Sequence, residues 1–569
     1  MEQGNEENVF KIGLCLAGAI SAGAYTAGVI DYLIEALERW ETEKKQGEDV
    51  PNHQVVIEVI GGASAGGMTG IITAAALQEK FSSVSKSGET LFQIQEDNKL
   101  YNSWVDLVSN DMMNVILDTS DINCKVESLL NSEFIDKLAD RALQINTEKP
   151  IDRPYISDDL KVFVTLSNLN GFQYSAEFNE KISSSNKYVI SAHNDFACFQ
   201  LTKNLESKTL PGWMPLNFKE NINTTVLKNA AMATGAFPLG FKARRLSRDS
   251  KYLTENPWLE DLIGTDKIKV KNSYVTLNVD GGMINNEPFE FVAKALYLDQ
   301  NPEPNKESIT KNYLNKDKFQ KHDHFKSSIL LIDPFPSDST EFEDSTELSK
   351  VVGNVLGTLM DQARVKPIEV IKALNDDAYG QFIISPTRYE TNNDIEVSIE
   401  GSKAIACGSV GGFGGFINKE FRIHDYFLGR ANCERFLRYY FTVPADTKND
   451  IFQSGYKNVS DKRRFTVNDN EYQIIPIFHD EKPNGIYMPK FSNGKRWPTI
   501  EEKRILKLRP LVEKRVQKVM LNTIPLIWYE KLLLSIGLKV LLNRKISKSI
   551  INTLLELLKK HQLIETKTV

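Results

Sequence analysis

The sequence has few cysteines and no long apolar run. Its five cysteines are an odd number and lie far apart, without the spacing of a structural zinc site: Cys15, Cys124, Cys198, Cys407 and Cys433. Disulfides and a structural zinc are therefore not expected, and Cys15 is predicted to be a small core residue. No segment reaches the roughly 18 apolar residues that a membrane span needs, and residues 1–8 are polar. We therefore expect a protein of the cytoplasm.

Signals for nucleotides and nucleic acids are missing as well. The chain has no GxxxxGK phosphate loop. Its basic C-terminal stretch lacks the interleaved aromatic residues and the recognisable module that nucleic-acid binding would require. With 569 residues, 41% of them hydrophobic and 25% charged, the chain has the composition of a globular protein of two to four domains.

The most informative stretch is residues 55–68, which read VVIEVIGGASAGGM. A β-branched apolar run enters a glycine cluster around Ser64, and a small-residue helical pattern follows. Gly62 and Gly66 therefore flank a serine where a strand turns into a helix, which is the pattern of a nucleophile elbow. Side chains at the two glycines would collide with the strained backbone, and the helix start offers free N–H groups to a developing negative charge. Ser64 is the candidate nucleophile; the alternative is a glycine-rich turn with an incidental serine.

A serine needs a base to take its proton. Of the seven histidines, His322, His424 and His479 have the chain order of a Ser/Asp/His triad, but none has a convincing setting. A satisfied or solvated histidine is the preferred interpretation of each.

Asp280 is the stronger candidate for the base. An apolar strand, residues 274–279, delivers this carboxylate to its end, and Gly281 and Gly282 turn the chain away. A carboxylate at such a strand end can accept a hydroxyl proton directly. The alternative is a plain Asp-Gly turn.

Four blocks in this order resemble the patatin-like phospholipases, lipid acyl hydrolases that use a Ser/Asp dyad. They are GAYTAGV at residues 23–29 with the glycine at 18, the elbow at 62–66, AMATGAFP at 231–238, and Asp280-Gly281-Gly282 followed by Asn286 and Pro288. The resemblance covers about residues 8–300. It implies that Ser64 is the nucleophile, that Asp280 is the base, and that Gly62, Gly66, Gly281 and Gly282 support them. The family's independence of calcium agrees with the lack of an EF-hand-type loop.

The oxyanion loop departs from the family pattern. The family has a run of glycines, one further residue, Arg or Lys, and a glycine, whereas this chain has GAISAG at residues 18–23. Backbone N–H groups of Gly18, Ala19 and Ile20 remain the predicted oxyanion hole, since the donor is main chain. Ile20 is expected to resist a positive φ that glycine would accept. A weak or catalytically silent protein therefore remains an alternative.

The resemblance implies an α/β fold, a three-layer α/β/α sandwich, over residues 1–390. Apolar runs predict buried strands at 10–16, 162–166, 328–334 and 381–384. A helical insertion at about 80–150 has the position of a lid, a loop is expected at about 299–325, and a helix at about 346–375. Residues 391–569 form a predicted second, mainly helical region.

Residues 421–437 resemble a C-terminal block of a longer, bacterial-type subgroup of patatin-like proteins. Arg422, Arg430 and Arg435 either hold a phosphate head group or close on the active site, or they belong to a packed amphipathic helix with ion pairs. Residues 491–569 hold 17 Lys and Arg against 6 Asp and Glu, whereas residues 1–490 hold 52 against 69. Apolar residues at helical spacing over 546–558 predict a basic amphipathic helix. It either lies on an anionic bilayer or packs on the catalytic domain or a second subunit.

The resemblance and the basic tail predict a lipid acyl hydrolase of phospholipase A or lysophospholipase type that cleaves glycerophospholipid esters. Its expected partner is a phospholipid membrane surface, reached from the cytoplasm as a peripheral protein at the inner membrane face. No metal or organic cofactor and no nucleic acid are implied, and an activator or a homo-oligomer is left open. Two other classes remain: a silent lipid-binding or scaffold protein, and a hydrolase of soluble esters or acyl thioesters.

Overall fold

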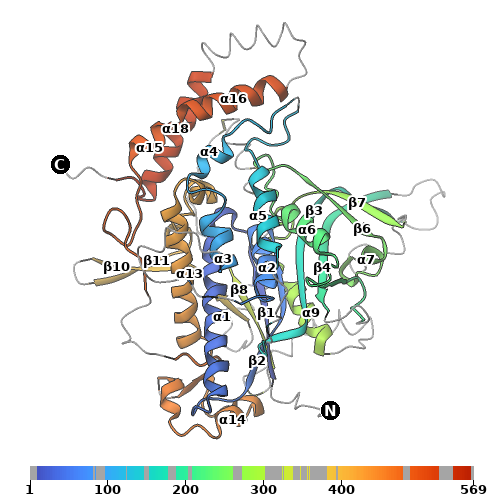
Figure 1. The fold of residues 1–569 in the computed structure, drawn as a ribbon, viewed down its shortest axis with the longest axis vertical. Coiled ribbons are helices and arrows are strands. Elements are labelled where there is room, and N and C mark those ends of the chain that lie inside the picture. Colours follow the sequence, from blue (N-terminus) through green and yellow to red (C-terminus); the bar gives the residue numbers. More distant parts are fainter. Residues whose placement is uncertain are drawn as a thin grey trace.

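A computed structural model places the apolar runs of the first 390 residues in one sheet (Figure 1). The structure describes residues 9–80, 97–123, 125–145, 153–176, 188–202, 208–259, 272–300, 326–336, 381–392, 395–468, 470–478, 487–523 and 543–565. It also describes a few isolated positions between these ranges. The statements below concern these residues.

The central sheet has nine strands, and most of their pairings are parallel. Its main path runs β5-β4-β3-β2-β1-β8-β9, and the hairpin β6-β7 joins it at β3. The pairings of β3 with β4 and β7, and of β6 with β7, are antiparallel. The strands are β1 (Val9–Leu16), β2 (Gln54–Gly62), β3 (Ile156–Ala176), β4 (Tyr188–Leu201), β5 (Met214–Leu216), β6 (Arg244–Asp249), β7 (Ser273–Asp280), β8 (Ser327–Ile332) and β9 (Gln381–Ile384).

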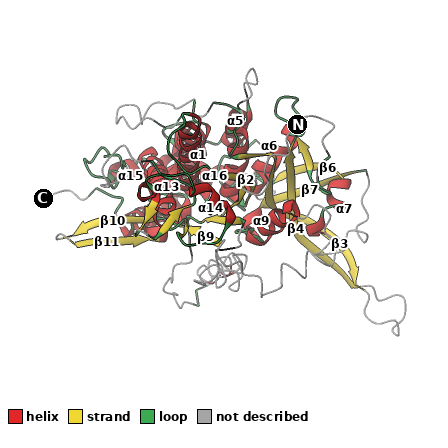
Figure 2. Cartoon of the chain, turned by 90° about the horizontal axis from the view of Figure 1, so that it is seen from below, coloured by secondary structure: helices red, strands yellow, loops and turns green. Residues whose placement is uncertain are grey.

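Helices cover both faces of this sheet (Figure 2). Successive side chains of a strand point to opposite faces, and Leu14 and Cys15 accordingly lie in two separate apolar cores. Helices α1 (Gly23–Lys45), α2 (Ser64–Ala76) and α6 (Thr224–Thr234) cover one face, and α9 (Phe289–Gln300) covers the other. Gly13 permits the close approach of α9, because a Cβ there would lie 2.6 Å from Val292. The predicted three-layer α/β/α arrangement is confirmed.

The predicted insertion is built of short helices. They are α3 (Lys99–Tyr101), the π-helix η3 (Asn102–Asp106), α4 (Met112–Ile116) and α5 (Glu133–Leu143). A further short helix, α7 (Lys251–Thr254), follows β6. The predicted loop at 299–325 and the predicted helix at 346–375 fall almost entirely outside the described residues.

The C-terminal region contains helices and two small sheets, so its mainly helical character is confirmed. The helices are α13 (Lys419–Tyr439), α14 (Asp450–Tyr456), α15 (Glu502–Leu506), α16 (Arg509–Thr523) and α18 (Asn543–Lys560). The small sheets are β10-β11 (Thr387–Asn392, Ile395–Glu400) and β12-β14-β13 (Thr442–Pro444, Glu471–Gln473, Thr466–Val467). Short 3-10 turns, η7 (Val410–Gly412) and η8 (Gly414–Phe416), precede α13. The domain boundary near residue 390 stays a prediction.

Helix α13 lies directly against α1, and the two backbones touch. A Cβ on Gly28 would lie 1.9 Å from the carbonyl oxygen of Tyr426, and a Cβ on Gly429 would lie 2.2 Å from that of Tyr25. Arg430 of α13 also forms a buried ion pair with Asp31 of α1. Only glycine allows helices to approach so closely, so these two positions determine how the C-terminal region sits on the central α/β fold.

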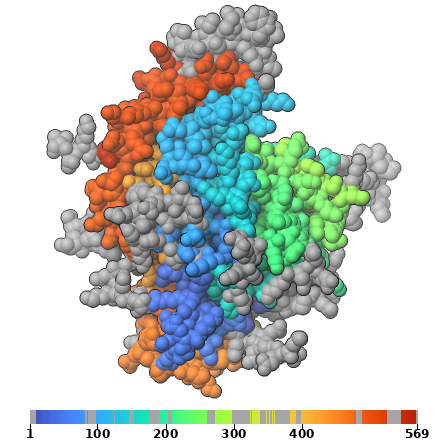
Figure 3. All heavy atoms as spheres, viewed as in Figure 1, coloured from blue at the N-terminus to red at the C-terminus, as the bar shows by residue number. Residues whose placement is uncertain are grey.

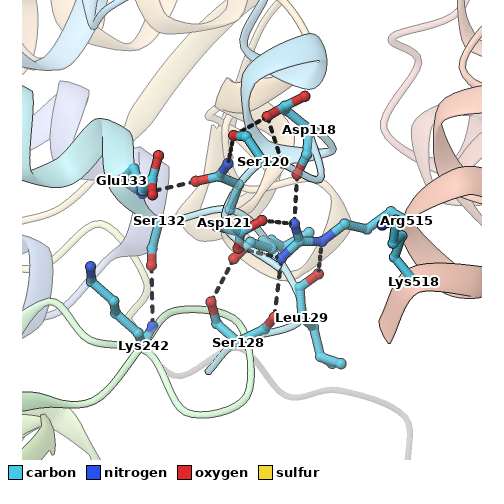
Figure 4. A network of polar contacts seen from close by, with 12 residues as sticks. Asp118, Ser120, Asp121, Ser128, Leu129, Ser132, Glu133, Lys242, Arg515 and Lys518 are labelled. Carbon is cyan, nitrogen blue, oxygen red and sulfur yellow. Dashed lines mark hydrogen bonds and ion pairs between the residues drawn. The ribbon is translucent and has the colours of Figure 1, made fainter. Parts of the chain in front are cut away.

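The basic tail helices pack on the rest of the molecule. In α18, Ile551, Leu554, Leu555 and Leu558 are buried. From α16, Arg515 donates to both carboxylate oxygens of Asp121 and to the carbonyl oxygen of Leu129 at 2.8 Å (Figure 4). The tail surface therefore adjoins that of the insertion (Figure 3). Among the helices of the described residues, none has the length and apolar character of a membrane span.

Replacing Gly429 by Ala tests the helix contact. Alanine favours a helix by about 1 kcal/mol over glycine, yet its methyl group would collide with Tyr25. We expect a net loss of roughly 1–3 kcal/mol in the free energy of unfolding, measured by denaturant titration. Ser549→Ala, at an exposed site in α18, is the matched control without a collision. A stabilised Gly429→Ala protein would contradict the contact.

Candidate active site

Ser64 lies at a strained turn between β2 and α2. Strand β2 ends at Gly62, and α2 begins at Ser64 itself. The backbone of Ser64 has φ 51°, in the left-handed region that few residues other than glycine adopt. Its N–H donates to the Thr234 hydroxyl at 2.9 Å. This geometry is that of a nucleophile elbow.

The two glycines of the elbow are required by close backbone contacts. A Cβ on Gly66 would lie 2.3 Å from the carbonyl oxygen of Leu16 and 2.4 Å from that of Ala17, at the end of β1. A Cβ on Gly62 would lie 2.8 Å from the backbone nitrogen of Gly67. The structure thus supplies the steric reason that the sequence predicts for both positions.

Asp280 ends β7 and is fixed from two sides. Its N–H donates to the carbonyl oxygen of Ala236 at 3.0 Å, and its own carbonyl oxygen accepts from the Ser167 hydroxyl at 2.7 Å. The N–H of Gly282 donates to Asp280 Oδ1 at 2.8 Å. Gly281 passes so close to β3 that a Cβ would lie 2.1 Å from the carbonyl oxygen of Thr165. The turn therefore leaves the second carboxylate oxygen to face another partner.

That partner is Ser64, whose Oγ donates to Asp280 Oδ2 at 2.5 Å. Both side chains are buried. Burial raises the pKa of the Asp280 carboxyl from its ordinary value of 3.8 to about 7, while hydrogen bonds from Ser64 and Gly282 act in the opposite direction. A base with a pKa near the working pH is well suited to proton transfer. The pair can therefore activate a serine oxygen at neutral pH.

The loop before α1 passes beside this pair. A Cβ on Gly18 would lie 2.9 Å from the Cβ of Ser64 and 2.3 Å from Asn286 Oδ1, so Gly18 must be glycine. Ala19 follows, and Ile20 begins the short 3-10 turn η2 (Ile20–Ala22). Ile20 has φ 47°, so it adopts the positive φ that it was expected to resist. A β-branched residue there is a genuine outlier, and such strain persists only where the surroundings enforce it.

An apolar cavity opens at Ser64 and Asp280. Both side chains of the pair line it. Beside the pair, its lining is almost wholly apolar: Ile20, Ala65, Met68, Ile72, Ser103, Trp104, Leu107, Phe134, Ile135, Leu138, Gly235, Phe237, Phe241 and Phe416. Such a cavity suits a hydrocarbon chain and offers few partners to a polar substrate.

The insertion supplies one wall of the cavity. The wall is formed by side chains of η3, by Leu107, which follows η3, and by side chains of α5. The Trp104 ring of η3 packs against the start of α1, where a Cβ on Gly23 would lie 2.4 Å from it. The sequence predicts a lid here; the structure places the segment over the nucleophile, and its opening stays a prediction. Thr234 and Phe416 were missed by the sequence analysis. Thr234 lies within the AMATGAFP block, whereas nothing local marks Phe416.

Among the described residues, the histidine of the triad order is His424, and it does not line the cavity. His424 is buried outside the cavity lining, hydrogen-bonds Asp425 at 2.7 Å and packs against Trp497. His322 and His479 lie outside the described residues. His424 is thus a core residue whose Nδ1 has a hydrogen-bond partner, whereas its buried Nε2 has none among the described residues.

The arginines of α13 have partners within the protein. Buried Arg422 donates to the carbonyl oxygens of Gly415 and Val105 at 2.5 and 2.8 Å. Arg430 pairs with Asp31, and the Arg435 guanidinium stacks over Tyr389 at 4.6 Å. These contacts favour the packed-helix alternative over a phosphate site. In the part of the chain that the structure describes, no cluster of three or more His, Cys, Asp or Glu side chains is placed to hold a metal ion.

Comparison with known proteins agrees with this geometry. The family model described as Patatin-like phospholipase matches residues 14–293, which include the elbow and Asp280. The chain is also 30% identical over 565 aligned residues to "Uncharacterized protein y4iI" of Sinorhizobium fredii (strain NBRC 101917 / NGR234). That alignment covers 90% of this chain and 75% of the relative, so the similarity extends beyond the family match into the C-terminal region.

The raised pKa of Asp280 predicts a stability cost. A carboxyl whose folded pKa lies above its unfolded value favours folding fully only below pH 3.8, and this contribution is lost as the pH rises to about 7. Asp280→Asn removes the cost of the buried charge. Its gain in unfolding free energy over the unaltered protein should grow by about 2–3 kcal/mol between pH 5 and pH 8. A difference between Asp280→Asn and the unaltered protein that stays constant between pH 5 and pH 8 would refute the assignment.

Proposed function

Because this chain belongs to the patatin-like phospholipase family, we propose that it is a lipid acyl hydrolase with Ser64 as nucleophile and Asp280 as base. The observation that carries the proposal is the 2.5 Å hydrogen bond between these two side chains at an apolar cavity. Its substrates are acyl esters of glycerophospholipids, cleaved as by a phospholipase A or lysophospholipase. The cavity supports this class because its apolar lining suits an acyl chain.

Acylation proceeds by proton transfer within the pair. Ionised Asp280 accepts the proton of Ser64 as the serine oxygen attacks the ester carbonyl carbon. Backbone N–H groups of the loop from Gly18 to Ile20 stabilise the oxyanion. The tetrahedral intermediate then collapses, and Asp280 returns the proton to the leaving alkoxide of the lysolipid or glycerol moiety. The acyl group remains as an ester on Ser64.

Deacylation repeats these steps with water. Asp280 accepts a proton from a water molecule, whose oxygen attacks the acyl carbonyl carbon. Collapse of the second intermediate releases the fatty acid, and the proton returns to the oxygen of Ser64. The serine and the carboxylate are thus regenerated, and every proton passes through the one carboxylate that contacts the nucleophile.

A membrane surface is the proposed partner, and exposed leucines mark the face that meets it. Leu129 and Leu239, here called the leucine rim, are 49% and 70% exposed, and the N–H of Leu129 donates to the carbonyl oxygen of Leu239 at 2.7 Å. Leu239 lies at the turn between Phe237 and Phe241, which both line the cavity. The Leu129 side chain points away from the Arg515 cluster (Figure 4).

Charge near the leucine rim also favours a bilayer. Arg515 fastens α16 to the segment of Leu129, and Lys514 and Lys518 of the same helix are exposed. Apolar side chains beside cations suit an anionic lipid surface, where each cation contributes on the order of 1 kcal/mol. We propose a peripheral protein acting on a membrane from the cytoplasm.

Fatty-acid release from mixed phospholipid vesicles tests the dyad. Ser64→Ala and Asp280→Asn should each lower release by at least about 1,000-fold, with the fold retained. Because only ionised Asp280 can act as base, kcat/KM of the unaltered protein should fall about tenfold per pH unit below pH 7. Lipid binding without turnover at any pH would favour the silent lipid-binding alternative.

The leucine rim gives a separate prediction. Changing both Leu129 and Leu239 to Ser should weaken binding to anionic vesicles by roughly tenfold or more, since burying a leucine is worth about 1.5–3 kcal/mol. Vesicle hydrolysis should fall with it, while turnover of a short-chain soluble ester should not change. Val397→Ser, an exposed apolar site on β11, is the control. Equal activity on vesicles and soluble esters, insensitive to the rim, would favour the soluble-ester alternative.

A further inference from the structure

The loop beside Ser64 is held by residues almost 400 positions away in sequence. Ser21, directly after strained Ile20, is buried within η2. Its hydroxyl donates to the carbonyl oxygen of Gly412 at 2.5 Å and accepts from the N–H of Gly415 at 2.9 Å. One side chain therefore joins the predicted oxyanion loop to both 3-10 turns that precede α13.

Two glycines make this contact possible. Gly412 has φ 92°, and a Cβ there would lie 3.2 Å from the Cδ1 of Ile20. A Cβ on Gly415 would lie 2.7 Å from the Ser21 hydroxyl and 2.8 Å from the sulfur of Cys407. The glycine-rich segment, residues 410–416, can therefore lie flat against the loop, and Ile20 is packed from that side.

Helix α13 fixes the glycine-rich segment and the residues just before it. The carboxylate of Asp425 accepts from the N–H groups of Ala406 and Cys407, which precede the segment, each at 2.8 Å. The guanidinium of Arg422 donates to the carbonyl oxygens of Gly415 and of Val105, which follows Trp104 in the cavity wall. Rigid contacts thus run from α13 through the glycine-rich segment to Ser21.

We propose that Ser21 is a positioning residue, and that the C-terminal region completes the oxyanion hole by acting through it. The two hydrogen bonds of Ser21 hold Ile20 in its left-handed conformation and thereby direct the backbone N–H groups of Gly18 to Ile20 at the ester oxygen. The contact replaces the conformational freedom that glycine would provide in this loop. This inference rests on the proposed function.

Ser21→Ala in the full chain tests the inference. The substitution removes one oxygen and both hydrogen bonds while leaving the backbone N–H groups in place. Because a misdirected oxyanion donor affects the transition state and not substrate binding, kcat on phospholipid vesicles should fall on the order of 100-fold while KM stays within about twofold. A purely structural role would lower the melting temperature without this division between kcat and KM.

A transition-state analogue gives a second measurement. In a long-chain trifluoromethyl ketone the carbonyl carbon adds the Ser64 oxygen and the carbonyl oxygen becomes an anion. Its affinity should fall in parallel with kcat in Ser21→Ala, whereas affinity for an unreactive ether-linked phospholipid should not change.

Tyr456→Phe is the matched control. It removes one buried hydrogen bond, from the Tyr456 hydroxyl to the carbonyl oxygen of Gln473 at 2.7 Å, in α14 at the opposite end of the molecule from α16 (Figure 1). We expect a lower melting temperature with unchanged kcat. If Ser21→Ala behaves like this control, the inference is wrong although the dyad stands. If the unaltered chain has no turnover that depends on Ser64, the proposed function fails and the inference with it.

Discussion

The contact between α1 and α13 is the constraint on which the proposed active site depends. Helix α1 begins directly after the loop of Gly18 to Ala22, and α13 begins directly after the glycine-rich segment. Because Gly28 and Gly429 let the two helices touch, their starts lie together, and Ser21 can bridge the two segments that precede them. The predicted oxyanion loop and the glycine-rich segment are thereby held together. The similarity to y4iI, which extends into the C-terminal region, agrees with a molecule that keeps both parts.

The proposed chemistry draws on conformations that oppose folding. Ser64 and Ile20 have positive φ, and Asp280 is an acid buried where its charge is poorly solvated. Each would relax or be replaced if stability alone mattered. In the proposed mechanism the first exposes the serine oxygen, the second shapes the oxyanion loop, and the third has a pKa suited to a base at neutral pH. The surrounding sheet and helices supply the stability that maintains them.

Local patterns predicted the dyad, because each of its members is marked by its neighbours. Ser64 follows the end of one apolar strand, Asp280 ends another, and glycines flank both. Strand β3 pairs with β2 and with β7 and so brings the two strand ends to a 2.5 Å contact. The conformation of Ile20 could not be predicted, since the residues that enforce it lie 391 or more positions away. The same is true of Phe416 in the cavity, and of Arg430, whose partner Asp31 is remote in sequence. The sequence of α18 could not distinguish a helix packed on protein from a helix lying on lipid, because both have apolar residues at the same spacing.

The most direct test of the central claim is to find which residue reacts with a probe that modifies activated serines. The protein would be treated at pH 8 with a long-chain fluorophosphonate, which phosphonylates an activated serine with loss of fluoride, and the modified peptide would be identified by mass spectrometry. The account predicts modification at Ser64, and its loss when Asp280 is replaced by Asn. Modification at another serine, or equal labelling of Ser64 without the Asp280 carboxylate, would contradict it.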